Sequence, residues 1–282
     1  MSKMHFLIPL LFLSSCVSEK SERVLFNSSR DGNSNIYLMD SEGTLQQITN
    51  DSTDEWAATW INDETISFLR QEESEIVRIA LDLTTGKETT QSHPANCLLD
   101  DKNILYNQDG SRGIYPCKGS LFLVDVSTND ITNITENMDG ISAYPSWGPD
   151  GTYVVFTNNQ GGANNVYRLT LADLASEILV ESPANDERGA ISPDGQYLVY
   201  SSNAGNSDNQ DLYLKDLSTG NTENITRSKG NELIARWSLN SRQLYFGSNT
   251  DGNWEIYRYD LHAKESTRLT FDPGFDGDPR IF

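Results

Sequence analysis

The sequence predicts an all-β fold, and three observations support this prediction. Residues 28–40 and 248–260 are identical at seven of thirteen positions although they lie 220 residues apart. The apolar pair in this stretch recurs at intervals of 40 to 46 residues, beginning at Ile36, Ile76, Leu121, Val166, Leu212 and Ile256. Turn-forming residues divide each interval into short apolar segments. Four strands per unit at this period are the signature of a β-propeller, here with six blades of antiparallel strands.

Each unit is expected to contain four strands in a fixed order. A second apolar strand precedes each pair; the six candidates are residues 24–26, 66–68, 104–106, 154–156, 198–200 and 244–246. Before it comes a strand that ends in a turn such as "SWGPDG" (146–151), with weaker relatives at 190–195, 236–241 and 59–64. A short fourth strand follows at "QIT", "NIT" or "RLT". A single blade leaves both sheet faces exposed, so the strands repeat because stacked blades cover each other.

The two ends of the repeat region complete one blade. The first unit begins at its second strand, Val24, and lacks a first strand. The last residues, "GDPRIF" (277–282), match that missing strand. We therefore expect the C-terminal strand to close the ring, which removes the exposed sheet edges of an open array.

The N-terminus has the order of a bacterial lipoprotein signal. Lys3 is followed by an apolar stretch over residues 6–13 and then by Leu13-Ser14-Ser15-Cys16, which resembles a lipobox. The sequence thus predicts a signal peptide over 1–15, a tether over 16–22 lipidated at Cys16, and the propeller over 23–282. The alternative is an ordinary signal peptide. Val17 favours an outer-membrane anchor, with the protein facing the periplasm or the cell surface.

Composition limits the remaining possibilities. The formal net charge of −20 disfavours binding to nucleic acid, because an acidic surface repels phosphate. Cys97 and Cys117 could form a disulfide in an oxidising compartment, or they could be two thiols. Five aspartates follow the third strands and are expected to cap turns rather than bind metal: Asp40, Asp82, Asp125, Asp216 and Asp260. No cofactor or metal is predicted.

The repeat resembles that of TolB-like six-bladed propellers, also described as the WD40-like PD40 repeat. The matching residues are "SSRDGNSNIYLMD" (28–40), 146–156, 191–201 and 237–260. The resemblance covers residues 23–282 and implies the fold more specifically than the function, since similar propellers accompany peptidases and form polysaccharide lyases. TolB itself resembles a two-domain protein with an α/β domain before the propeller. Only about six residues separate Cys16 from the first strand, so we expect a TolB-like protein other than the Tol component.

Candidate site residues come from aligning the units at the innermost strand on Trp60, Leu98, Trp147, Ile191, Trp237 and Ile281. One level of the axial mouth then holds His93, Glu55, Ser142, Asp186, Glu232 and Asp276. Tyr144, Arg188 and Asp278 are two positions further along the aligned strands. Arg236 and Arg280 are two positions beyond these. Arginine suits bidentate recognition of carboxylates. The alternatives are acidic loops without function and, for His93, a solvated loop residue.

Two functional classes remain open. G-x-S-x-G and phosphate-loop motifs are absent from the sequence. We therefore expect a non-enzymatic envelope lipoprotein that binds a protein, peptide or glycan at the axial mouth, and that contacts the membrane only through its lipid. The alternative is a polysaccharide-processing enzyme of the lyase type, in which His93 could act with a tyrosine.

Overall fold

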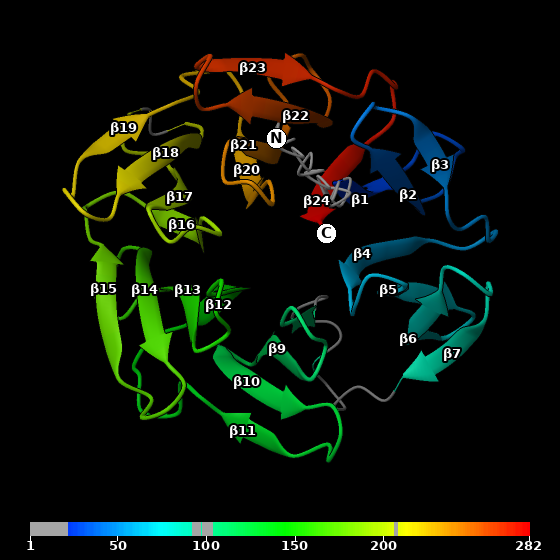
Figure 1. Ribbon diagram of the computed structural model, residues 1–282, viewed down its shortest axis with the longest axis horizontal. Helices are drawn as coiled ribbons and strands as arrows, with labels where there is room; N and C mark the ends of the chain where they lie inside the picture. The colour runs from blue at the N-terminus through cyan, green and yellow to red at the C-terminus, as the bar shows by residue number, and fades with distance from the viewer. Residues whose placement is uncertain (1–21, 92–96, 98–103, 206–207) are drawn as a thin grey trace, which may run out of the picture.

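Six four-stranded antiparallel sheets form a closed ring around a central axis in the computed structural model (Figure 1). The structure describes residues 22–91, 97, 104–205 and 208–282, and no helix occurs among them. Each sheet is one blade of the propeller. The all-β prediction with six blades of four strands is confirmed.

The four strands of each blade lie side by side, one after another from the axis outward. The innermost strands are β24 (Asp276–Ile281), β4 (Glu55–Trp60), β8 (Leu105–Tyr106), β12 (Ser142–Trp147), β16 (Asp186–Ile191) and β20 (Glu232–Trp237). The second strands are β1 (Arg23–Ser28), β5 (Thr65–Glu72), β9 (Arg112–Cys117), β13 (Tyr153–Asn158), β17 (Tyr197–Ser202) and β21 (Gln243–Ser248).

The outer half of each blade contains its third strand and a short, exposed fourth strand. The third strands are β2 (Asn35–Asp40), β6 (Glu75–Asp82), β10 (Ser120–Asp125), β14 (Asn165–Thr170), β18 (Asp211–Asp216) and β22 (Glu255–Asp260). The fourth strands are β3 (Leu45–Gln47), β7 (Glu88–Gln91), β11 (Ile131–Asn133), β15 (Ser176–Val180), β19 (Thr222–Asn224) and β23 (Glu265–Arg268).

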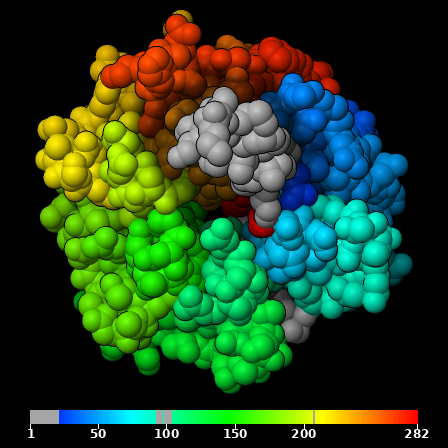
Figure 2. Space-filling view, in the orientation of Figure 1, coloured from blue at the N-terminus to red at the C-terminus, as the bar shows by residue number. Residues whose placement is uncertain are grey.

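The C-terminal strand closes the ring, as the sequence predicts. β24 pairs antiparallel with β1, with Val24 opposite Ile281 and Leu25 opposite Arg280. The first blade thus contains both ends of the propeller in a single sheet, β24-β1-β2-β3. The space-filling view shows the same closure, since the earliest and latest coloured segments adjoin (Figure 2).

The hydrophobic core lies between neighbouring blades. Leu25 and Ile36 of the first blade pack with Trp60, Ile66 and Phe68 of the second. Equivalent clusters join the third blade to the fourth, the fourth to the fifth, the fifth to the sixth, and the sixth to the first. Apolar residues occur on both faces of these strands because each face is covered by another blade.

The predicted turn aspartates do cap turns. The carboxylate of Asp82 accepts hydrogen bonds from the backbone N–H groups of Thr84 and Thr85, at 2.9 and 2.8 Å. The other four accept equivalent bonds, and the pKa of each is lowered mainly by these contacts with the backbone or with neighbouring hydroxyls. These residues therefore fix the turn between the third and fourth strands.

Candidate functional site

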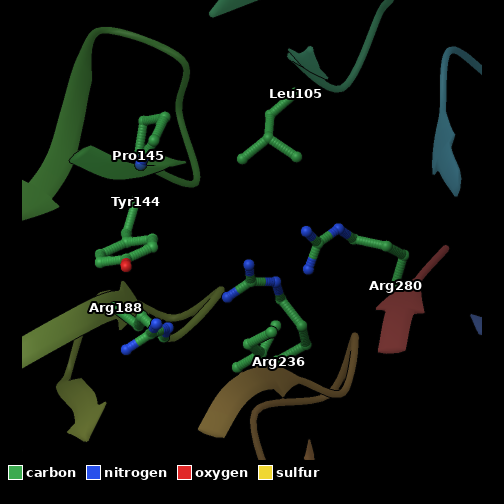
Figure 3. A pocket seen from close by; sticks show the side chains of 7 residues that line it. Leu105, Tyr144, Pro145, Arg188, Arg236 and Arg280 are labelled. Atoms are coloured by element: carbon green, nitrogen blue, oxygen red, sulfur yellow. The ribbon is translucent and has the colours of Figure 1, made fainter. Parts of the chain in front are cut away.

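A pocket of about 130 Å³ lies on the propeller axis (Figure 3). Its walls come from the innermost strands of five blades: Leu105, Tyr144, Pro145, Arg188, Ile234, Arg236 and Arg280. Four of these seven residues, Tyr144 and the three arginines, are among those predicted from the sequence to line the axial mouth. The structure therefore brings these four side chains together although Tyr144 and Arg280 are 136 positions apart in the chain.

A repeated β-bulge directs side chains toward this pocket. In the fifth blade, Glu187 pairs with Ser201 but Ala190 pairs with Val199, so Arg188 and Gly189 face a single residue of β17. Arg188 has a φ of +58°, and the same position of four other inner strands also has positive φ, at Ala57, Tyr144, Ile234 and Asp278. A bulge bends its strand and re-aims the side chains on it. Because the bulge recurs in five blades, it is a feature of the repeated blade structure and not of one strand alone.

The three arginines have different immediate partners. Arg188 forms a salt bridge with its neighbour Glu187, and its guanidinium carbon lies 3.9 Å from the centroid of the Tyr144 ring. Arg280 donates to the carbonyl oxygen of Pro279 at 3.3 Å. Arg236 donates to the carbonyl oxygen of Ala235 at 3.0 Å. Figure 3 shows the guanidinium groups of Arg236 and Arg280 extending into the same space.

The guanidinium groups of Arg188, Arg236 and Arg280 converge on one pocket, which concentrates positive charge there. Burial holds the pKa of Arg236 well below its usual value; Arg280 lowers it further, Asp278 opposes the shift, and Arg188 adds a smaller lowering. Since arginine stays protonated in proteins, the shift indicates that the charge is unfavourable where it lies. An anion bound in the pocket would relieve this cost.

The acidic residues predicted for the mouth occupy the expected strand level, but their side chains are buried and do not line the pocket. Glu55, Asp186, Glu232 and Asp276 are at most 1% exposed. Glu55 is bound by Arg70 at 2.7 Å, and Asp276 by Arg30 at 2.9 Å. Asp186 accepts from Ser182, and Glu232 accepts from Ser228 and Ser248. These acids therefore connect strands within the propeller.

Burial also raises the pKa of each of these acids. For Glu232 the value rises to about 7, because desolvation outweighs its two serine hydrogen bonds, and Asp211 raises it further. The pKa values of Asp186, Asp276 and Glu55 are raised in the same direction, with desolvation as the main cause.

Comparison with known proteins agrees with the propeller fold. Residues 192–279 match the model of the dipeptidyl peptidase IV N-terminal region. A TolB homologue from Chlorobium chlorochromatii is 29% identical over 176 residues, which are 62% of this chain and 27% of that protein. The crystal structure of TolB from Acinetobacter baumannii superposes with a TM-score of 0.78 at 17% identity, covering 92% of this chain and 66% of that one. The chain is a TolB-like propeller.

A similar propeller fold also occurs in an enzyme. An oligogalacturonate lyase solved in complex with manganese superposes with a TM-score of 0.56 at 15% identity, covering 85% of this chain and 86% of the lyase. At this identity the likeness concerns the fold alone. In the described part of the TolB-like propeller, no group of three or more His, Cys, Asp or Glu side chains is arranged to hold a metal ion.

The sequence prediction for the third blade of the TolB-like propeller is wrong in its two inner strands. Residues 104–106 were expected as the second strand and Leu98 on the innermost one. Instead β8 (Leu105–Tyr106) is innermost and β9 (Arg112–Cys117) is second. Trp147 confirms the equivalence, because its indole N–H donates to the carbonyl of Leu105 at 2.7 Å, as that of Trp237 donates to Ala190 at 2.9 Å.

The cause of the error is a diverged turn. Residues 107–110, "NQDG", form the turn that other blades make with "SPDG". Asp109 accepts from the backbone N–H of Ser111 at 2.9 Å, and Asp194 makes the equivalent bond to Gln196 at 3.0 Å. Gly110 has a φ of +72°, and a Cβ there would lie 2.6 Å from the carbonyl oxygen of Ile61. The Asp-Gly pair was the signal that could have located this turn.

The remaining predicted site residues have different outcomes. Asp278 is partly exposed, does not line the pocket, and accepts a hydrogen bond from Asn27 at 3.1 Å. His93 and Cys16, the residue predicted to be lipidated, lie outside the described residues. Cys97 and Cys117 form a disulfide. The described residues include no helix long and apolar enough to cross a membrane.

Sequence reasoning missed three residues that line the pocket. Ile234 occupies the same bulge position as Arg188 and could have been found from the same alignment. Pro145 follows Tyr144 directly. Leu105 was missed because the third blade was misaligned. These residues give the pocket an apolar portion beside its arginines.

A second cleft lies between the first and second blades and is more polar. It has a volume of about 380 Å³ and its lining includes Gln46, Asp51, Arg70 and Glu88. Its arginine is already paired, because Arg70 binds Glu55 and both oxygens of Glu88 at 2.7 Å. The axial pocket is therefore the better candidate for an anionic ligand.

Proposed function

We propose that this protein is a non-enzymatic binding module of the bacterial cell envelope that docks a protein, peptide or glycan at its axial mouth. The observation that carries the proposal is the convergence of Arg188, Arg236 and Arg280 with Tyr144 on one pocket. Arginine and tyrosine are enriched among residues that dominate binding energy. A guanidinium binds carboxylates but does not act as a proton acceptor at ordinary pH.

We further propose that the propeller is tethered to the outer membrane through a lipid on Cys16. The last residue of the proposed tether, Glu22, contacts the sixth blade. Its carboxylate accepts from the backbone N–H of Leu239 at 2.6 Å and from the Tyr245 hydroxyl at 3.0 Å. These contacts support a tether that leaves the ring at a defined point. A cysteine that carries two acyl chains would anchor the protein without a membrane-spanning segment.

A polysaccharide lyase is the second candidate, and the arginine pocket is the observation that favours it. Arginines could bind the carboxylates of an acidic sugar chain, and the fold resembles an oligogalacturonate lyase. Against it, the described residues that line the pocket include neither a carboxylate nor an imidazole to remove a proton. Incubation with acidic oligosaccharides, followed by ultraviolet absorbance for unsaturated products, distinguishes the two. Accumulating product would replace the binding proposal with the lyase.

Site-specific photo-cross-linking in the native envelope tests the docking position. We would place the cross-linker at Tyr144, which is 41% exposed at the mouth, and separately at Ile178, which is 44% exposed on an outermost strand. The proposal expects one partner captured from Tyr144 and not from Ile178. Capture from Ile178 alone would move the docking surface to the side of the propeller.

A further inference from the structure

The charge of the axial pocket is opposite to that of the protein. The chain has a formal net charge of −20, yet the charged residues lining the pocket are Arg188, Arg236 and Arg280. Among the described residues Arg236 forms no salt bridge, and its guanidinium donates to a backbone carbonyl of its own strand. Arginines this close together repel one another, so an unliganded pocket carries an electrostatic cost.

The rest of the lining is apolar or aromatic. Leu105, Pro145 and Ile234 contribute aliphatic surface, and Tyr144 contributes a ring face beside Arg188. Among the described residues of the lining, all the charged groups are hydrogen-bond donors. A sugar ring presents many hydroxyl groups that need both donors and acceptors, whereas a carboxylate on a short aliphatic stem needs donors at one end and apolar contact at the other.

The negative charge of the protein outside the pocket further limits the classes of ligand that fit. A polyanion such as an acidic polysaccharide would bring many negative groups against a strongly acidic protein. In a ligand with a single carboxylate, that group would contact the arginines of the pocket. Its neutral or basic flanking residues would lie against the acidic surface around the pocket without repulsion. Both features favour a polypeptide segment over an acidic glycan.

Resting on the proposed function, we infer that the axial pocket binds one isolated carboxylate of a polypeptide, whose flanking residues are neutral or basic. The carboxylate can come from a chain terminus or from a glutamate side chain. In either case, Arg236 and Arg280 bind the oxygens, while Leu105, Pro145 and Ile234 contact the aliphatic stem.

Isothermal titration calorimetry at low ionic strength with four probes tests this inference. The probes are acetyl-Gly-Lys-Leu with a free carboxylate, the same peptide as its amide, acetyl-Gly-Lys-Glu-Leu amide, and trigalacturonate. We expect at least one of the two peptides that contain a carboxylate to bind ten-fold or more tighter than acetyl-Gly-Lys-Leu amide, which contains none. Tighter binding of acetyl-Gly-Lys-Leu would identify a chain terminus as the source of the carboxylate, and tighter binding of the glutamate peptide would identify a side chain. Equal affinity of the amide, or tighter binding of trigalacturonate, would overturn the inference.

Two substitutions connect the binding to the pocket. Arg236→Met should reduce the affinity of the carboxylate peptide at least ten-fold, and without ligand it should melt at or above the parent temperature because an unpaired charge is removed. Arg242→Met, at an exposed arginine outside the pocket, should match the parent in both measurements. A lower melting temperature and unchanged affinity for Arg236→Met would mean that this arginine has a structural role, which contradicts the inference.

The outcome is separable from that of the docking proposal. If the cross-linker at Tyr144 captures a partner while carboxylate and amide peptides bind equally, docking at the mouth stands and the carboxylate inference fails. If no partner is captured at Tyr144, the docking proposal itself fails.

Discussion

The indole N–H of Trp60 donates to the carbonyl oxygen of Arg280 at 3.2 Å, which joins residues 220 positions apart in the chain. Trp60 lies on the second blade and Arg280 on the strand that closes the first. The Arg280 side chain lines the axial pocket. Ring closure and the candidate site therefore depend on the same strand.

Deletion of residues 277–282 should severely destabilise the protein or cause aggregation. The deletion removes the pairing of β24 with β1 and the Trp60–Phe282 contact, whose ring centroids lie 5.2 Å apart. It also exposes two sheet edges. Thermal unfolding followed by circular dichroism measures the effect, and a truncated protein melting within a degree or two of the parent would contradict the closure.

A milder pair of substitutions tests the same closure. Phe282→Ala removes a partly buried ring and should cost about 1–2 kcal/mol of unfolding free energy. Phe271→Ala removes an aromatic ring that is 73% exposed and serves as the control. Equal effects from the two would indicate that Phe282 contributes no packing to the closure.

Glu232 should make the protein less stable as the pH rises. Burial raises its pKa to about 7 in the folded protein, against 4.5 for a glutamate in water, so the folded state keeps a proton that the unfolded state loses. The stabilisation is complete below about pH 4.5 and is lost as the pH rises through 7, amounting to about 3 kcal/mol at most. Glu232→Gln should flatten the dependence of unfolding free energy on pH between these values.

The matched control for this experiment is Glu265→Gln, on an exposed outer strand, which should keep the parental slope. The raised pKa values of Asp186, Asp276 and Glu55 add slope of the same sign, so the Glu232 variant should retain part of it. Identical slopes in the parent and Glu232→Gln would show that this carboxyl is ionised in the folded protein.

Cys16→Ala should release the protein from membranes, either as a soluble form or as an unprocessed precursor. The physical reason is that the acyl chains would be its apolar anchor. Fractionation of cells followed by a salt wash measures the distribution. A variant that still sediments with membranes after the wash would contradict lipidation.

The sequence was sufficient to predict the blades because their signal is repeated. A turn such as residues 146–151 is weak alone, but its recurrence at a fixed spacing identifies the strand on each side. The same alignment located Tyr144, Arg188, Arg236 and Arg280 near one another. The third blade failed because a single unit had diverged at residues 107–110, and a shift there misassigned its inner strands.

Other features of the site depend on geometry that the alignment does not contain. The inner-strand bulge determines that Arg188 points inward, and it is visible only as a register shift between β16 and β17. The alignment also could not show whether an acidic side chain at this strand level is exposed at the axial mouth or buried. Glu55 and Asp276 are bound by Arg70 and Arg30, which lie on or just after the neighbouring strand.

The most direct test of the axial site is the affinity for the cross-linked partner of a variant in which Arg188, Arg236 and Arg280 are all replaced by alanine. At roughly 2 kcal/mol or more per desolvated hot-spot residue, the combined loss should reach several kcal/mol. The variant must melt like the parent, and Arg242→Ala should bind normally. We expect binding to fall by orders of magnitude with the fold retained; unchanged affinity would show that the partner binds elsewhere on the propeller.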